Sequence, residues 1–139
     1  MDSDQAIRNG LALLTASLRQ EVDTFQVRAY VRGLKDIAPD VILEAADALS
    51  TQIGRRFFPT VPEWVTACAN VVDARRKAAA HTAKALQEQC PDCHGSGWRD
   101  AEGPNAVEKC TCVTRALALV QAAGAPRPAL PPSTDSEVV

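Results

Sequence analysis

The segment at residues 57–64, Phe-Phe-Pro-Thr-Val-Pro-Glu-Trp, constrains the fold of this 139-residue chain more than any other stretch. It holds three of the six aromatic residues, so it is the expected anchor of a core. Pro59 favours an extended conformation at Phe58, and Thr60 with Glu63 forms the Thr-x-x-Glu capping box that begins a helix. The segment therefore predicts an elbow, after which a long helix starts. A purely structural elbow is the simplest interpretation.

The composition favours helices. Hydrophobic residues make up 46% of the chain but aromatic residues only 4%, so the apolar mass is alanine, leucine and valine. Such a composition suits packed helices better than a sheet rich in β-branched and aromatic residues. We therefore expect an all-α fold: a small helical bundle with a long fourth helix, an appended zinc-binding module and a disordered C-terminal tail.

Hydrophobic periodicity predicts three helices before the elbow, over residues 3–20, 24–36 and 40–53. Gly10 costs the first of them roughly 1 kcal/mol relative to alanine, which is consistent with another element packing closely there. Gly54 is placed to end the third helix. The apolar stripe of that third helix is predicted to comprise Ile42, Ala45, Ala46, Leu49 and Ile53.

Changes in composition divide the chain into four parts. We expect a helical bundle domain at residues 1–75 and an exposed, alanine-rich helical extension at 76–89. A zinc-binding module with a short closing helix is expected at 90–124. The last part, 125–139, is rich in proline and poor in large apolar residues, so it is predicted to be a disordered tail.

Four of the five cysteines form two close pairs, Cys90-x2-Cys93 and Cys110-x-Cys112, separated by sixteen residues. Two short-range cysteine pairs joined by a loop supply the four tetrahedral ligands that Zn²⁺ prefers. An all-cysteine site leaves no position open for water, so the zinc is expected to be structural. The gap within the second pair is tight, so His94 is retained as an alternative ligand.

The text Cys-Pro-Asp-Cys-His-Gly-Ser-Gly resembles one repeat of the zinc module of J-domain chaperones. It occurs once and without a J-domain, so a chaperone is not indicated. Cys68 lies on the apolar stripe of the fourth helix and is predicted to be a core residue.

Basic residues concentrate in the middle of the chain. Residues 54–84 carry six bases and two acids, whereas the segments on either side are acidic. This distribution is compatible with an anionic partner, although a solvated helix face explains it as well. Trp98 has two interpretations as well: it covers the core of the zinc module, or it stacks on a nucleic-acid base. The candidate nucleic-acid residues are Arg75, Arg76, Lys77, Lys84, Trp98 and Arg99.

No catalytic motif is present. The sequence contains no Walker-type phosphate loop, no H-E-x-x-H and no G-x-S-x-G. We therefore expect no enzymatic activity and no small-molecule substrate. No apolar run of about 18 residues is present to span a membrane, and residues 1–5 lack the basic start of a signal peptide. A cytoplasmic protein with reduced cysteines is the expectation.

One pattern resembles a known family. It consists of Tyr30-x3-Leu34, Ala45-Ala46-x2-Leu49 and Phe57-Phe58-Pro59-Thr60-Val61-Pro62-Glu63. This pattern, over roughly residues 5–75, looks like that of phage replisome-organiser and helicase-loader proteins, which are small and helical. The resemblance implies binding to a DnaB-type replicative helicase and its delivery to the origin, often with a flexible C-terminal segment on the helicase. The zinc module is a departure from the simplest members of that family.

Two hypotheses follow. The first is a phage-type replication accessory protein whose partner is a DnaB-type helicase, with single-stranded DNA as a further candidate ligand through the basic helix and the zinc module. The second is a zinc-stabilised regulator or inhibitor that binds a host protein or DNA. The second hypothesis in its DNA-reading form requires a recognition helix with base-reading side chains, and none is evident.

Overall fold

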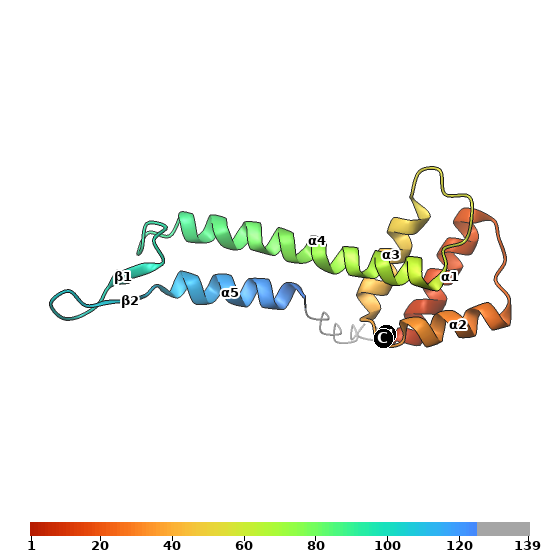
Figure 1. The fold of residues 1–139 in the computed structure, drawn as a ribbon, viewed down its shortest axis with the longest axis horizontal. Coiled ribbons are helices and arrows are strands. Elements are labelled where there is room, and N and C mark those ends of the chain that lie inside the picture. Colours follow the sequence, from red (N-terminus) through yellow and green to blue (C-terminus); the bar gives the residue numbers. More distant parts are fainter. Residues whose placement is uncertain (125–139) are drawn as a thin grey trace, which may run out of the picture. The chain divides into compact units, whose positions relative to one another are not determined.

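The computed structural model describes residues 1–124, which form five helices and one two-stranded sheet (Figure 1). The elements are α1 (Ser3–Leu18), α2 (Thr24–Leu34), α3 (Pro39–Ser50), α4 (Val61–Glu88), β1 (Trp98–Asp100), β2 (Val107–Lys109) and α5 (Thr111–Ala123). The predicted helical fold with a long fourth helix and a cysteine module is confirmed. The tail predicted at 125–139 lies outside the described residues.

The described chain divides into two compact units, residues 1–68 and the residues from Ala69 onward. The boundary falls within α4, earlier than residue 75, at which the sequence analysis places it. Among residues 1–124, no helix is long and apolar enough to cross a membrane.

The helices of the first unit begin at polar caps. The Asp2 carboxylate accepts a hydrogen bond from the Gln5 amide at 2.8 Å and starts α1. Asp23 and Gln26 form a reciprocal capping box at the start of α2. Pro39 occupies the first turn of α3, where its missing N–H costs nothing.

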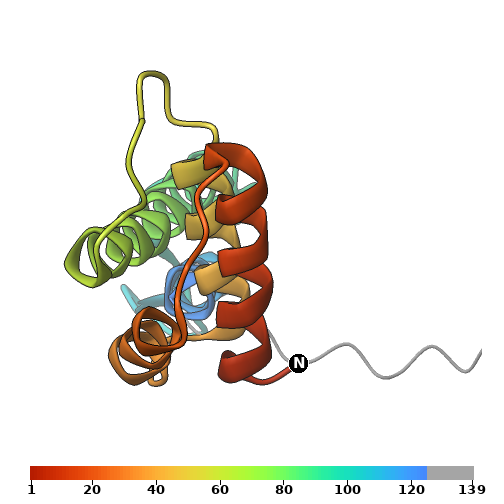
Figure 2. The ribbon, with the colours of Figure 1, turned by 90° about the vertical axis from the view of Figure 1, so that its right-hand side faces the viewer.

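Trp64, at the start of α4, is the centre of the first unit's core. Its side chain is fully buried, and its indole N–H donates to the Ile42 carbonyl at 3.3 Å. A Cβ atom added to Gly10 would lie 2.7 Å from the indole ring, so α1 needs glycine at this position. The close packing suspected at Gly10 is therefore real. The helices α1 and α3 lie side by side in this unit (Figure 2).

Tyr30 joins α2 to the elbow. Its hydroxyl donates to the Pro59 carbonyl, and its ring meets Phe58 edge-on at 5.9 Å and Trp64 at 5.5 Å between centroids. Pro59 and Trp64 are fully buried, so the elbow does anchor a core as expected. Phe57 differs: it is 77% exposed and takes no part in that core.

The end of α3 differs from the prediction. The helix stops at Ser50: the Gln52 amide donates to the Leu49 carbonyl at 3.4 Å, and the Thr51 hydroxyl donates to the Ala48 carbonyl at 3.3 Å. Ile53 therefore lies beyond the helix and is fully exposed, so its assignment to the apolar stripe is wrong. Gly54 has a positive φ of 82°, but in the α3–α4 loop (residues 51–60) and not as the helix cap.

The second unit contains most of α4, the β-hairpin and α5. β1 and β2 are antiparallel, with Trp98 opposite Lys109. α5 runs back along α4 (Figure 1), and a Cβ on Gly124 would lie 2.8 Å from Arg76 Nε. The segment at 76–89, which the sequence suggests has little to bury, is thus partly covered: Ala83 is buried.

Candidate metal centre

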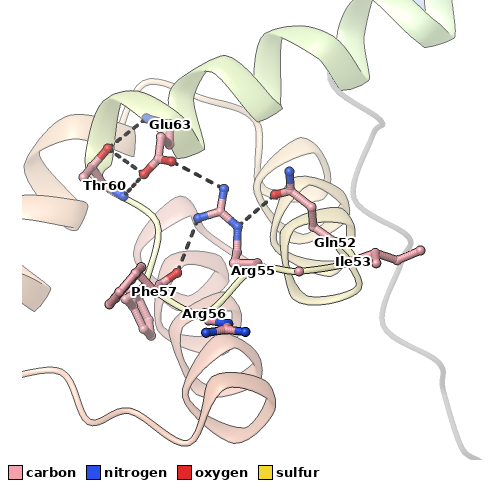
Figure 3. Close-up of a pocket in the computed structure, with 9 residues that line it drawn as sticks. Gln52, Ile53, Arg55, Arg56, Phe57, Thr60 and Glu63 are labelled. Atoms are coloured by element: carbon pink, nitrogen blue, oxygen red, sulfur yellow. Dashed lines mark hydrogen bonds and ion pairs between the residues drawn. The ribbon is translucent and has the colours of Figure 1, made fainter.

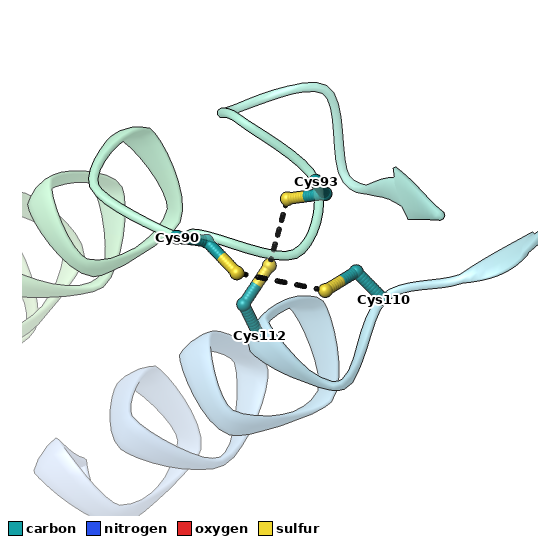
Figure 4. Close-up of side chains that lie close together, drawn as sticks. All are labelled: Cys90, Cys93, Cys110 and Cys112. Carbon is teal, nitrogen blue, oxygen red and sulfur yellow. Dashed lines mark hydrogen bonds between the residues drawn. The ribbon is translucent and has the colours of Figure 1, made fainter. Parts of the chain in front are cut away.

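Four cysteine side chains meet where α4, the hairpin and α5 join (Figure 4). Cys90 and Cys93 lie in the turns after α4, Cys110 is the N-cap of α5, and Cys112 is in its first turn. Their Sγ atoms all lie within 4.8 Å of one another. Cys93, Cys110 and Cys112 are buried and Cys90 is half-buried.

Backbone turns bring the two pairs together. The His94 amide donates to the Cys90 carbonyl at 2.9 Å and the Ser96 amide to the Cys93 carbonyl at 3.0 Å, which winds the chain around the first pair. Gly97 follows with a positive φ of 79°. Its carbonyl accepts from the Cys110 amide at 2.9 Å, so one backbone hydrogen bond ties the first cysteine pair to the second.

The spacing of the sulfur atoms fits a tetrahedral ion. Cys90 and Cys110 Sγ are 3.6 Å apart, and Cys93 and Cys112 Sγ are 3.5 Å apart. These distances are far longer than a disulfide bond of about 2.0 Å. A tetrahedron with metal–sulfur bonds of about 2.3 Å has edges of about 3.8 Å. The four cysteines could therefore hold a metal ion, with no coordination position left for water.

The pKa values of two thiols, Cys112 and Cys93, are shifted in opposite directions. Desolvation raises the pKa of Cys112, and hydrogen bonds with Cys93, Cys110 and Cys90 raise it further, to about 12. Desolvation also acts on Cys93, but the amides of Gly97 and Gly95 and the neighbouring thiols lower its pKa to about 7. Cys93 is thus the readier thiolate of these two, and metal binding must displace the proton that Cys112 retains.

Comparison with known proteins identifies no family. No family model matches this chain, and no curated protein or solved structure matches it. The function therefore has to be inferred from the residues and their arrangement.

His94 is not among the side chains that meet at this centre. It is exposed, and its positive φ of 51° belongs to the turn between Cys93 and Gly95. Cys68 lies elsewhere, buried on α4, where desolvation raises the pKa of its thiol to about 11. This buried environment agrees with the predicted role of Cys68 as a core residue.

The candidate nucleic-acid residues of the described chain do not all present free charges. Lys84 pairs with Glu88 at 3.7 Å, and Arg99 pairs with Glu108 at 2.6 Å across the hairpin. The remaining basic candidates, Arg75, Arg76 and Lys77, lie on α4.

Trp98 is 51% exposed, and it is not among the side chains packed against the cysteine cluster. Its cross-strand neighbour is Lys109, which the sequence analysis does not single out. The alternation of side chains along a strand places Arg99 on the other face.

A pocket of about 380 Å³ lies in the α3–α4 loop (Figure 3). Its lining includes Ile53, Arg55, Arg56, Phe57 and Glu63. Sequence reasoning misses it because Ile53 continues the four-residue spacing of α3 and Phe57 belongs to an aromatic cluster. Both features predict burial, and the structure exposes both side chains.

Proposed function

We propose that the four cysteines bind one structural Zn²⁺ that holds the hairpin to the ends of α4 and α5. The observation behind this is the set of four sulfur atoms within 4.8 Å of one another. An all-thiolate set suits a soft or borderline ion, and four protein ligands leave no site for catalysis. Within residues 90–112 the buried apolar side chains are few, so the ion would supply the cohesion that a core normally gives.

Metal analysis tests this proposal. Protein purified without added metal should carry close to one equivalent of zinc, and Cys93→Ser with Cys112→Ser should carry almost none. The matched control is Cys68→Ala, which removes a buried cysteine outside the cluster and should keep its zinc. Iron in place of zinc would contradict the choice of metal, and no metal in any preparation would contradict the site.

We further propose that the protein is a phage-type DNA replication accessory protein that binds a DnaB-type replicative helicase and assists its loading. The support is that residues of the family-like pattern pack together. Tyr30 from the first part of the pattern donates to Pro59 in the last part, and Ala45, Ala46 and Leu49 from the middle are buried. The residues of the pattern thus lie in one packed unit.

Single-stranded DNA is left out of this proposal. Lys84 and Arg99 already pair with carboxylates, and exposed pairs of this kind leave little net charge for a phosphate backbone. Residues 90–112 contain four acids and two bases, a net charge of −2 before any thiolate is counted. The net charge of this module therefore gives no support for a contact with single-stranded DNA.

Size-exclusion chromatography with light scattering tests the helicase proposal. Zinc-loaded protein is mixed with the DnaB-type helicase of the host, with and without ATP. A stable co-eluting complex is expected, and its mass gives the stoichiometry. No complex under either condition would contradict the proposal and favour the regulator hypothesis.

A further inference from the structure

Ile53, Arg56 and Phe57, here called the elbow surface, are one part of the first unit that the fold does not use, and Phe25 with Arg28 on α2 is another. Ile53 is fully exposed and Phe57 is 77% exposed. They lie at opposite ends of the pocket-lining loop, with Arg55 and Arg56 between them (Figure 3). The elbow surface thus presents two large apolar groups on either side of a basic centre.

This exposure does not arise from a loosely held loop. The Arg55 guanidinium donates to Gln52 Oε1 at 2.8 Å and to the Phe57 carbonyl at 3.4 Å, and it pairs with Glu63 at 3.5 Å (Figure 3). Only 14% of the Arg55 side chain is exposed. Arg55 is therefore an internal brace that fixes the loop from the pocket side.

A second brace comes from the α1–α2 connection. The Gln20 side chain donates to the Arg56 carbonyl and accepts from the Phe58 amide, each at 3.1 Å. The backbone on both sides of Phe57 is thus held by one amide group. A braced loop loses little conformational entropy when a partner binds, so its exposed side chains are pre-organised for contact.

The charge of the elbow surface indicates the chemistry of the surface that would bind it. Arg55 is engaged by Glu63, whereas the Arg56 side chain is exposed and has no ion-pair partner within residues 1–124. An exposed arginine beside an aromatic and an aliphatic group has the composition of an interface hot spot. The complementary surface carries apolar side chains around a carboxylate.

We propose that the elbow surface is the docking site for the DnaB-type helicase, and that it binds an apolar segment of the helicase with a carboxylate facing Arg56. This inference rests on the proposed function for the identity of the partner. It goes beyond it by assigning binding to Ile53, Arg56 and Phe57, in a part of the chain separate from the cysteine module.

The test measures equilibrium affinity between zinc-loaded full-length protein and the helicase. Phe57→Ser, Ile53→Ser and Arg56→Glu should each weaken binding about tenfold or more, as loss of a hot-spot side chain does. The matched controls are Phe25→Ser and Arg28→Glu, an 80% exposed phenylalanine and an exposed arginine on α2. The controls should bind within about twofold of wild type, since exposed residues outside an interface contribute little.

The outcomes separate the two proposals. If wild type binds and the three elbow variants bind equally well, the docking site is wrong and the proposed function stands. If wild type does not bind, both are wrong.

Equal losses in the controls would contradict a localised site. A dimer of the chain alone that Phe57→Ser dissociates would show that a second copy occupies the surface, which also overturns the inference. Thermal unfolding of each variant checks the fold, and Phe57→Leu provides a milder second substitution.

Discussion

Tyr30 shows how one polar atom connects the elbow to the helices. The phenol is buried with the Pro59 carbonyl as its acceptor, and desolvation, with a smaller effect of the Glu63 charge, raises the pKa of Tyr30. The hydroxyl therefore remains a donor at neutral pH. Tyr30→Phe keeps the ring contacts but leaves a buried carbonyl unpaired, so we expect a loss of about 1–3 kcal/mol in unfolding free energy.

Urea unfolding in a Trp98→Phe background, where Trp64 is the single tryptophan, measures this loss by fluorescence. Phe25→Leu is the control, because an exposed ring on the same helix should change stability by less than about 0.5 kcal/mol. Unchanged stability of Tyr30→Phe would mean that the hydrogen bond to Pro59 contributes nothing.

Glu63 gives the capping box a pH dependence. The backbone amide and the hydroxyl of Thr60 hold the pKa of the Glu63 carboxyl below its ordinary value, against a small opposing effect of desolvation, and Arg55 lowers it further. A lowered pKa in the folded state means that the ionised group stabilises the fold above the ordinary glutamate pKa. That stability is lost as the pH falls through the folded pKa.

Wild type should therefore be more stable than Glu63→Gln at neutral pH, and the difference should shrink as the pH falls below the ordinary glutamate pKa. Comparing the unfolding midpoints of both proteins at each pH isolates Glu63 from the other carboxylates, which titrate in both. A difference that stays constant with pH would show that the charge of Glu63 is irrelevant and only its shape matters.

At the scale of elements, the contact between α1 and α4 depends on Gly10. Alanine there would gain roughly 1 kcal/mol of helix propensity, but its Cβ would lie 2.7 Å from the ring of the fully buried Trp64. Overpacking a core costs about 1–3 kcal/mol. Because the indole has no room to move, we expect Gly10→Ala to destabilise the protein despite the better propensity.

Thermal or urea unfolding of Gly10→Ala gives the net sign. The matched control is Ala12→Gly, at an exposed position of the same helix, which should cost about 1 kcal/mol from propensity alone. A stabilised Gly10→Ala would contradict the close contact with Trp64.

The sequence predicts the helices well where caps and periodicity agree, and poorly where a local hydrogen bond competes. The helices predicted to start at residues 3 and 24 do start there, capped by Asp2 and Asp23. The end of α3 is different: Ile53 keeps the four-residue spacing from Leu49, but the Thr51 hydroxyl donates to the Ala48 carbonyl, the helical acceptor for the Gln52 amide. That competition depends on side-chain rotamers, which periodicity does not encode.

The two candidate sites also differ in how far the sequence predicts them. Two short cysteine spacings predict the ligand set of the metal centre, because cysteines two or three residues apart can face one ion after a single turn. The elbow surface is not predictable in this way. Its exposure depends on hydrogen bonds from residues distant in sequence, such as the bond that the Phe58 amide donates to the Gln20 side chain.

At the scale of the whole molecule, we expect the two units to respond differently when the metal is removed. The buried side chains of the first unit come from α1, α2, α3 and the start of α4, whereas the cysteines form a cluster of their own with Val113. Structural zinc contributes about 10–16 kcal/mol of apparent binding free energy in small domains. A strong chelator should therefore abolish the order of the hairpin and leave the first unit folded. The two tryptophans report on the two units, Trp64 in the first and Trp98 in the second.

In Trp98→Phe, Trp64 is the single tryptophan, and its urea unfolding midpoint should be nearly the same with and without chelator. In wild type, the additional signal of Trp98 should change as soon as the metal is removed, before any urea is added. Cys93→Ser without chelator should reproduce the metal-free result, which excludes an effect of the chelator itself. A Trp64 midpoint that falls together with the metal content would contradict this prediction. It would mean that α4, which begins in the first unit and ends in the second, carries the loss of stability from the metal centre into the first core.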